Sequence, residues 1–177
     1  MKPTLVFSSW LVACNGGVAV KVLQAAVILG CFVAVASSQT IARAYVDSTG
    51  AVHVVDSAAA NHVMAREKGQ VGCEHLRVAE DHKTVAWSVL YENCCTSYPI
   101  PLKIVIYRHG RLTRISSPQM IWDWKFVSGG QQIAASFGPV HGDASGVELY
   151  DARTGKRLAS WNLKGRRPKW AEGLRSE

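Results

Sequence analysis

A stiff loop between two β-rich runs is the feature that most constrains the fold of this 177-residue chain. The loop, residues 94–101, contains Pro99 and Pro101, which fix φ and remove two amide donors, so it cannot be regular secondary structure. Residues 84–91 alternate apolar with smaller or polar side chains, which predicts a half-buried strand, and residues 102–107 form a β-branched run. The sequence therefore predicts two strands joined by a rigid connection that carries two cysteines.

Short strands separated by turns continue through the rest of the chain. Residues 45–55 predict a hairpin around a Gly-containing turn, and residues 58–65 predict a short helix capped by Asp56 or Ser57, with an ordered loop as an equal alternative. From Gly72 onward the pattern is strand and turn only. We therefore expect a mainly β fold of antiparallel meanders, packed as a small sandwich or one curled sheet and preceded by an N-terminal hydrophobic helix.

Two units of this pattern are alike. Residues 78–87 match residues 126–135, and residues 104–112 match residues 147–158 apart from a longer turn. The units, about 73–117 and 120–163, have a period typical of propeller blades. The turn at residues 151–156 resembles the one joining the outer strands of many β-propeller blades, such as the WD and quinoprotein types. The resemblance implies a fold only, and a closed propeller is excluded because two units and a hairpin provide too few blades.

Residues 1–44 read as a targeting region. Lys21 precedes an apolar run, residues 22–36, and Ala42-Arg43-Ala44 has the small residues that signal peptidase requires. A cleaved signal peptide, an uncleaved membrane anchor and a buried helix all remain open, as does cleavage after Ser38. We expect a globular domain at 45–163 that is exported to the periplasm, cell envelope or extracellular space.

Cys14 gives a further alternative for the N-terminus. Residues 11–14 resemble the lipobox of bacterial lipoproteins, which implies an acylated Cys14, although the residues that follow are hydrophobic. Translation starting near Val18 or Val20 is the other interpretation.

Positive charge gathers at the C-terminus. Residues 153–177 hold eight Lys and Arg against two acidic residues, whereas residues 45–152 hold nine against eleven. Residues 164–177 therefore predict a solvated basic tail that folding does not need. Its basic side chains could meet another envelope protein or an anionic surface, and export argues against nucleic acid. These side chains are Lys164, Arg166, Arg167 and Lys169.

Three cysteines follow the targeting region, and an oxidising compartment favours their pairing. A four-residue turn at 80–83 would set Arg77 against Ala86 and Cys73 against Leu90. Cys73–Cys94 is then the expected disulfide, with Cys73–Cys95 as the alternative and a strained vicinal bridge last.

The remaining candidate side chains are aromatic or lie in loops. Strand alternation places Trp122 and Trp124 on one face, as a binding platform or as core residues. Tyr98, in the proline loop, and the loop residues His141 and Asp143 are further candidate binding residues, but none of the six histidines has metal-ligand spacing. We expect no metal, cofactor or catalytic residue.

These features favour an exported, non-catalytic binding or scaffolding domain of the cell envelope. An enzyme or enzyme subunit that uses the 94–101 loop or the His141 loop is the first alternative. A structural piece that completes its sheets by pairing with another chain is the second.

Overall fold

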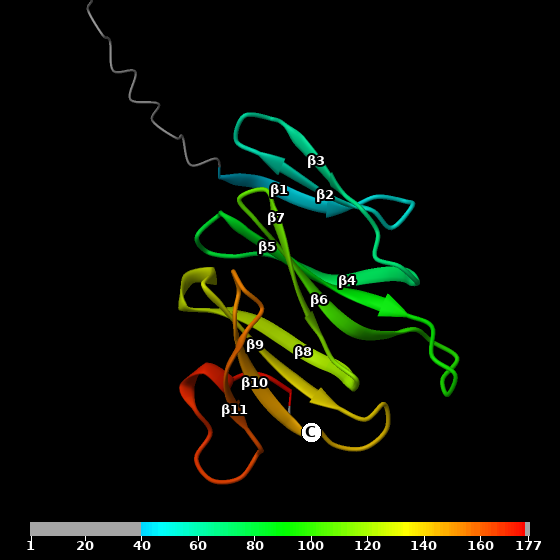
Figure 1. Cartoon of the computed structure of the whole chain (residues 1–177), viewed down its shortest axis with the longest axis vertical. Coiled ribbons are helices and arrows are strands. Elements are labelled where there is room, and N and C mark those ends of the chain that lie inside the picture. Colours follow the sequence, from blue (N-terminus) through cyan, green and yellow to red (C-terminus); the bar gives the residue numbers. More distant parts are fainter. Residues whose placement is uncertain (1–39, 176–177) are drawn as a thin grey trace, which may run out of the picture. The chain divides into compact units, whose positions relative to one another are not determined.

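The computed structural model describes residues 40–175, and these form three antiparallel sheets (Figure 1). The predicted N-terminal helix lies outside the described residues. Sheet A contains β1 (Ile41–Val46), β2 (Val52–Asp56) and β3 (Asn61–Met64). Sheet B contains β4 (Gln70–Val78), β5 (Thr84–Tyr91), β6 (Ile100–Arg108) and β7 (Arg111–Ser116). Sheet C contains β8 (Met120–Val127), β9 (Gln132–Gly138), β10 (Gly146–Asp151) and β11 (Arg157–Trp161), and two 3-10 turns complete the fold, η1 (Ser128–Gly130) and η2 (Lys169–Ala171).

The mainly β prediction is confirmed, and none of the three sheets closes. Each sheet is a meander in which neighbours in sequence are neighbours in space. The helix predicted over residues 58–65 is wrong, because this stretch enters β3. The Asp56 carboxylate accepts hydrogen bonds from the amides of Ala58 and Ala60 and so forms a tight turn, which returns the chain to pair with β2.

The sheets stack face to face in chain order, with an apolar core in each interval (Figure 1). The core between sheets A and B contains Val54, Met64 and Trp87, and that between sheets B and C contains Ile106, Trp124 and Ile133. Sheet A begins at Ile41, whose amide donates to the carbonyl of His82, in the turn between β4 and β5, at 2.6 Å. The strand therefore starts before the boundary predicted at Tyr45, and Ile41 is 5% exposed.

Sheet B is the centre of this stack and is buried on both faces. In β5, Val85, Trp87 and Val89 face sheet A, as the alternation predicted. The opposite face was expected to be solvated, yet Thr84, Ala86 and Ser88 are buried as well. Their small size leaves room for Trp124 of sheet C, whose Nε1 donates to Ser88 Oγ at 2.8 Å. A half-buried strand was therefore the wrong interpretation of residues 84–91.

A bulge in β4 changes the predicted register. Arg77 faces Ala86 as expected, but Cys73 faces Val89 rather than Leu90. The pairing shifts between Glu74 and Arg77, where His75 takes a φ of +52°. The extra residue turns the Cys73 side chain into the core between sheets A and B.

The C-terminal segment, residues 162–175, packs against the outer face of sheet C. Ala171 and Leu174 are 0% and 3% exposed and lie against Val147 and Leu149. The Lys125 side chain of β8 also donates to the Glu172 carbonyl. A solvated tail was therefore the wrong interpretation of this segment, because Ala171 and Leu174 are buried against sheet C.

Candidate functional site

The three cysteines of the described chain are unpaired and lie in two different environments. Cys73 is half-buried, and its thiol donates to the Gly50 carbonyl at 3.8 Å. Burial raises the pKa of the Cys73 thiol, which makes it a poor nucleophile. Cys94 and Cys95 are exposed beyond the end of β5, and a hydrogen bond to Cys94 raises the pKa of Cys95. Among residues 40–175 no disulfide is formed, so the predicted Cys73–Cys94 bond and its Cys95 alternative are not present there.

The loop between β5 and β6 is held by its own polar groups. The Asn93 side-chain amide donates to Thr96 Oγ1 at 3.1 Å, and Thr96 Oγ1 donates to the Tyr98 carbonyl at 2.6 Å. A shallow pocket of about 400 Å³ lies beside it, lined by Val71, Tyr98 and Pro99 among others. Tyr98 is 50% exposed, which leaves its ring available to a partner.

Trp122 and Trp124 do not form a platform. The pairing of β8 with β9 shifts between Ile121 and Asp123, which breaks the alternation that would have aligned the two indoles. Trp124 is fully buried between sheets B and C, under the guanidinium of Arg77 at 5.0 Å. The Trp122 Nε1 donates to the Pro139 carbonyl at 3.0 Å, and Arg175 of the C-terminal segment lies 5.0 Å from its ring. The core interpretation therefore holds for Trp124 alone.

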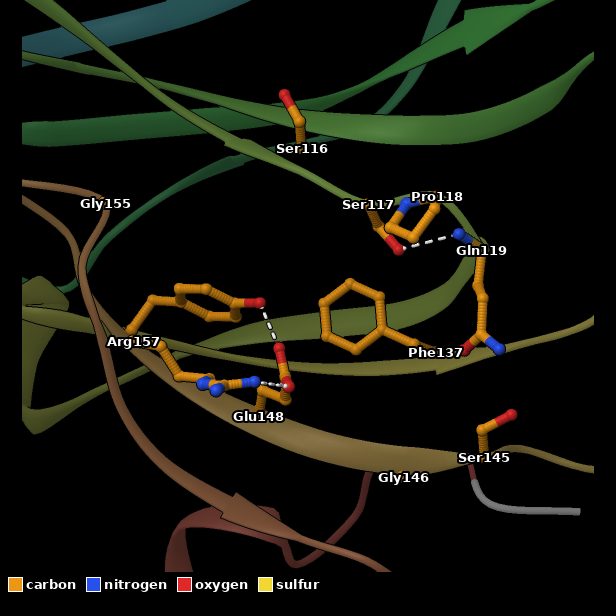
Figure 2. A pocket seen from close by; sticks show the side chains of 11 residues that line it. Ser116, Ser117, Pro118, Gln119, Phe137, Ser145, Gly146, Glu148, Gly155 and Arg157 are labelled. Carbon is orange, nitrogen blue, oxygen red and sulfur yellow. Dashed lines mark hydrogen bonds and ion pairs between the residues drawn. The ribbon is translucent and has the colours of Figure 1, made fainter.

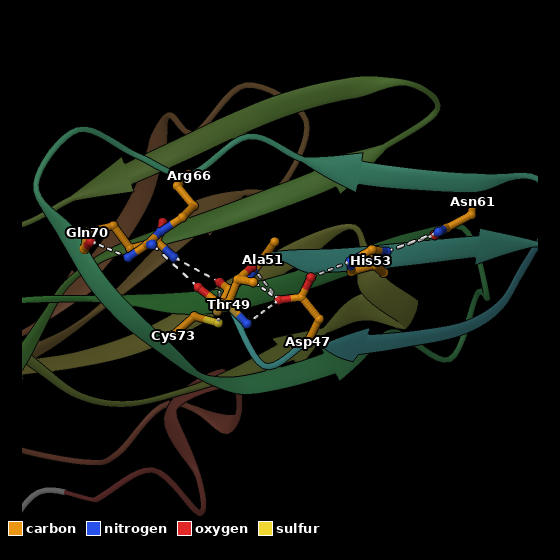
Figure 3. A network of polar contacts seen from close by, with 9 residues as sticks. Asp47, Thr49, Ala51, His53, Asn61, Arg66, Gln70 and Cys73 are labelled. Carbon is orange, nitrogen blue, oxygen red and sulfur yellow. Dashed lines mark hydrogen bonds and ion pairs between the residues drawn. The ribbon is translucent and has the colours of Figure 1, made fainter.

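The histidines do not form a metal centre within residues 40–175, where no group of three or more His, Cys, Asp or Glu side chains comes together. His141 and Asp143 are exposed in the loop between β9 and β10. The His53 ring is held by two side chains: its Nε2 lies 2.9 Å from Asp47 Oδ2, and its Nδ1 contacts the Asn61 side chain (Figure 3). Hydrogen bonds from Thr49 and His53 hold the pKa of Asp47 well below its usual range.

A pocket of about 550 Å³ opens at the edge between sheets B and C, and we call it the inter-sheet pocket (Figure 2). Sheet C contributes Phe137 and Tyr150, whose rings lie 6.2 Å apart in an edge-to-face arrangement. Across from them the chain leaves β7 through a short turn that supplies Ser117 and Gln119. The turn is fixed by a 3.0 Å bond from the Gln119 amide to Ser117 Oγ. The remaining lining residues are Ser116, Pro118, Ser145, Gly146, Glu148, Gly155 and Arg157.

A neutralised carboxylate is the main polar group of this pocket. Arg157 Nη1 donates to Glu148 Oε1 at 2.6 Å, and the Tyr150 hydroxyl donates to Glu148 Oε2 (Figure 2). Burial, together with the bond to Glu148, raises the pKa of Tyr150 far above its usual range, so its hydroxyl stays protonated. The Arg157 side chain is 61% exposed, so its guanidinium can donate further hydrogen bonds.

Sequence reasoning missed this constellation, although a signal for it is present. Residues 147–150 alternate, so Glu148 and Tyr150 project from one face of β10 while Val147 and Leu149 project from the other. Arg157 pairs directly with Tyr150 on the neighbouring strand. The signal is that Glu148, a charged residue, shares a face of β10 with Tyr150, a core residue, which indicates a polar site at the edge of the core.

The C-terminal segment carries the basic side chains that the sequence singled out. Lys164, Arg166 and Lys169 are exposed, whereas Arg167 is half-buried with its guanidinium 5.1 Å from the Trp161 ring. The loop that carries them is held by the Trp161 Nε1, which donates to the Lys164 carbonyl at 2.9 Å. These cations therefore project from an ordered backbone.

The chain matches no known family model, and a search of curated proteins finds no similar sequence. Among residues 40–175 there is no helix long and apolar enough to cross a membrane.

Proposed function

We propose that this protein is an exported, non-catalytic binding module that attaches to the anionic lipid surface of the cell envelope through its C-terminal segment. The observation that carries the proposal is that this segment is anchored on its apolar side and cationic on its exposed side. Ala171 and Leu174 fix it to sheet C, and Lys164, Arg166 and Lys169 face solvent.

The side chains of the segment favour a lipid surface over an acidic polymer. Trp161 and Trp170 pack against the apolar cluster of sheet C but are only half-buried, so part of each indole stays at the surface near the basic residues. Indole rings beside Lys and Arg suit the headgroup region of a bilayer, where apolar and charged groups are both accommodated. Each such cation contributes about 1 kcal/mol of attraction near an anionic membrane surface.

Export fits this function, and the position of β1 favours one of the two cleavage sites for a signal peptide. Cleavage after Ala44 would delete Ile41, which is buried in the core between sheets A and B. Cleavage after Ser38 would leave β1 whole. N-terminal sequencing of the fractionated protein should therefore find a start before Ile41; a start at Tyr45 or an intact cytosolic Met1 would contradict this.

Co-sedimentation with vesicles tests the attachment. The purified chain should bind equimolar phosphatidylglycerol–phosphatidylcholine vesicles, fail to bind phosphatidylcholine alone, and be released by added salt. The triple variant Lys164→Glu/Arg166→Glu/Lys169→Glu should bind at least about 100-fold more weakly, because three attractive charges become repulsive. Arg167 is kept because it packs on Trp161.

A matched control separates local attraction from net charge. The variant Lys68→Glu/Arg111→Glu/Lys156→Glu changes the net charge equally at exposed positions outside the C-terminal segment. It should retain most of the vesicle binding. Equal loss in both variants would overturn the proposal, and so would binding to an acidic polysaccharide with none to vesicles.

A further inference from the structure

The inter-sheet pocket has chemistry that restricts its ligand, independently of the attachment to lipid. Its apolar wall is Phe137, which is 6% exposed and continues the core between sheets B and C to the protein surface. Its polar wall consists of Glu148, Arg157 and the turn that carries Gln119 (Figure 2). A volume of about 550 Å³ lies in the range of pockets that bind small molecules.

The Glu148–Arg157 pair selects against charged ligands. An ammonium group that approached Glu148 would meet the guanidinium of Arg157, 2.6 Å from the carboxylate. A carboxylate or phosphate that approached Arg157 would meet Glu148. Each charge thus opposes the ligand that the other would attract.

The same pair is suited to neighbouring hydroxyl groups. Each carboxylate oxygen of Glu148 accepts one hydrogen bond from within the protein and keeps a lone pair for another donor. Arg157 keeps unused N–H groups on its exposed side chain. A vicinal diol can donate one hydrogen bond to Glu148 and accept one from Arg157.

The other lining residues extend this match. The Phe137 ring is 6% exposed, so it offers a small apolar contact to the C–H groups of a ligand that carries hydroxyls along its edge. In Figure 2 Gln119 and Ser145 lie beside this ring, where they can bond further hydroxyl groups. We propose that the inter-sheet pocket binds an uncharged saccharide, with a vicinal diol between Glu148 and Arg157.

A glycan array tests the proposal on the purified chain, with neutral, amino-sugar and acidic glycans as probes. Binding should be confined to neutral glycans, and calorimetry with the best of them gives the affinity. Arg157→Ala and Gln119→Ala should each weaken binding about tenfold, since each removes hydrogen bonds to the ligand. Arg153 is an exposed arginine in the turn between β10 and β11 and does not line the pocket. The control variant Arg153→Ala should therefore bind the glycan as the parent chain does.

Three results would overturn the proposal. One is the absence of binding to any neutral glycan by a chain that unfolds cooperatively. Another is a preference for acidic or amino sugars, which would show that one charge of the pair dominates. The last is neutral-glycan binding that Arg157→Ala and Gln119→Ala leave unchanged, which would place the sugar elsewhere. None of these outcomes depends on whether the chain binds lipid.

Discussion

Sheets A and C, at the two ends of the stack, are stabilised in different ways. The outer face of sheet C is apolar and is covered by Ala171 and Leu174 of the chain's own C-terminal segment. Sheet A instead has a polar aromatic cluster: Tyr45 stacks on His53 with the ring centroids 4.7 Å apart, and Arg43 lies 5.2 Å from the Tyr45 ring. One end is thus stabilised by burying apolar surface and the other by side chains that tolerate water.

The difference explains how the C-terminal segment can have two roles. Its apolar residues cover sheet C, which fixes the backbone, while the side chains of Lys164, Arg166 and Lys169 are exposed and available to a partner. Sheet A needs no such cover, because Asp47 and Asn61 hold the His53 ring in place (Figure 3). The end that the chain itself covers is therefore the one that we propose faces the membrane.

Removing the C-terminal segment from sheet C should have the largest effect on stability. Truncation after Leu163 exposes Val147 and Leu149 and should lower the free energy of unfolding by about 3–5 kcal/mol. The single change Leu174→Ala should cost about 2–4 kcal/mol, since the side chain is 3% exposed. Urea unfolding measures both changes. A truncated chain as stable as the parent would show that sheet C does not need its cover.

Acid should weaken sheet A by a smaller amount. Hydrogen bonds hold the pKa values of Asp47 and Asp56 below those of the unfolded chain. Groups with a lowered folded pKa stabilise the fold above their unfolded pKa, about 4, and this contribution is lost as the pH falls toward the folded value. Urea unfolding from pH 6 to pH 3 should show this decline, and Asp47→Asn should flatten it. If Asp47→Asn and the parent chain had the same dependence of stability on pH, the ionised Asp47 carboxylate would not stabilise the fold.

An apolar residue at the uncovered end should matter least. Val63 of β3 is 58% exposed, so Val63→Thr should change the free energy of unfolding by less than about 0.5 kcal/mol. It is the counterpart of Leu174→Ala at the other end. If thermal unfolding showed that Val63→Thr and Leu174→Ala lower the stability by similar amounts, the two ends of the stack would not differ as described.

The alternation of apolar and polar residues in the sequence was enough to predict the positions of most strands, but not which of their faces are buried. Residues 84–91 have the alternation of a half-buried strand, and their full burial depends on Trp124, which arrives from another sheet. The C-terminal segment reads as solvated because only Ala171 and Leu174 are buried, and their contacts are distant in sequence. Burial of this kind is decided by tertiary packing, which a local pattern does not contain.

Bulges account for the errors of register. The extra residue near His75 moved Cys73 relative to β5, and the shift between Ile121 and Asp123 separated Trp122 from Trp124. The period of two that predicts which side chains share a face fails wherever one residue is inserted. The inter-sheet pocket escaped notice for a different reason, because Gln119 joins Glu148 only when sheets B and C stack.

Hydrogen–deuterium exchange on vesicles tests most directly whether the covered end is the one that binds. The chain is compared alone and with equimolar phosphatidylglycerol–phosphatidylcholine vesicles, and peptides from both ends are followed. Lipid should slow exchange at residues 164–170 and leave sheet A, residues 41–64, unchanged, because residues 164–170 carry three exposed cations, Lys164, Arg166 and Lys169, whereas sheet A carries one, Arg43. Protection of sheet A with none at residues 164–170 would contradict the account.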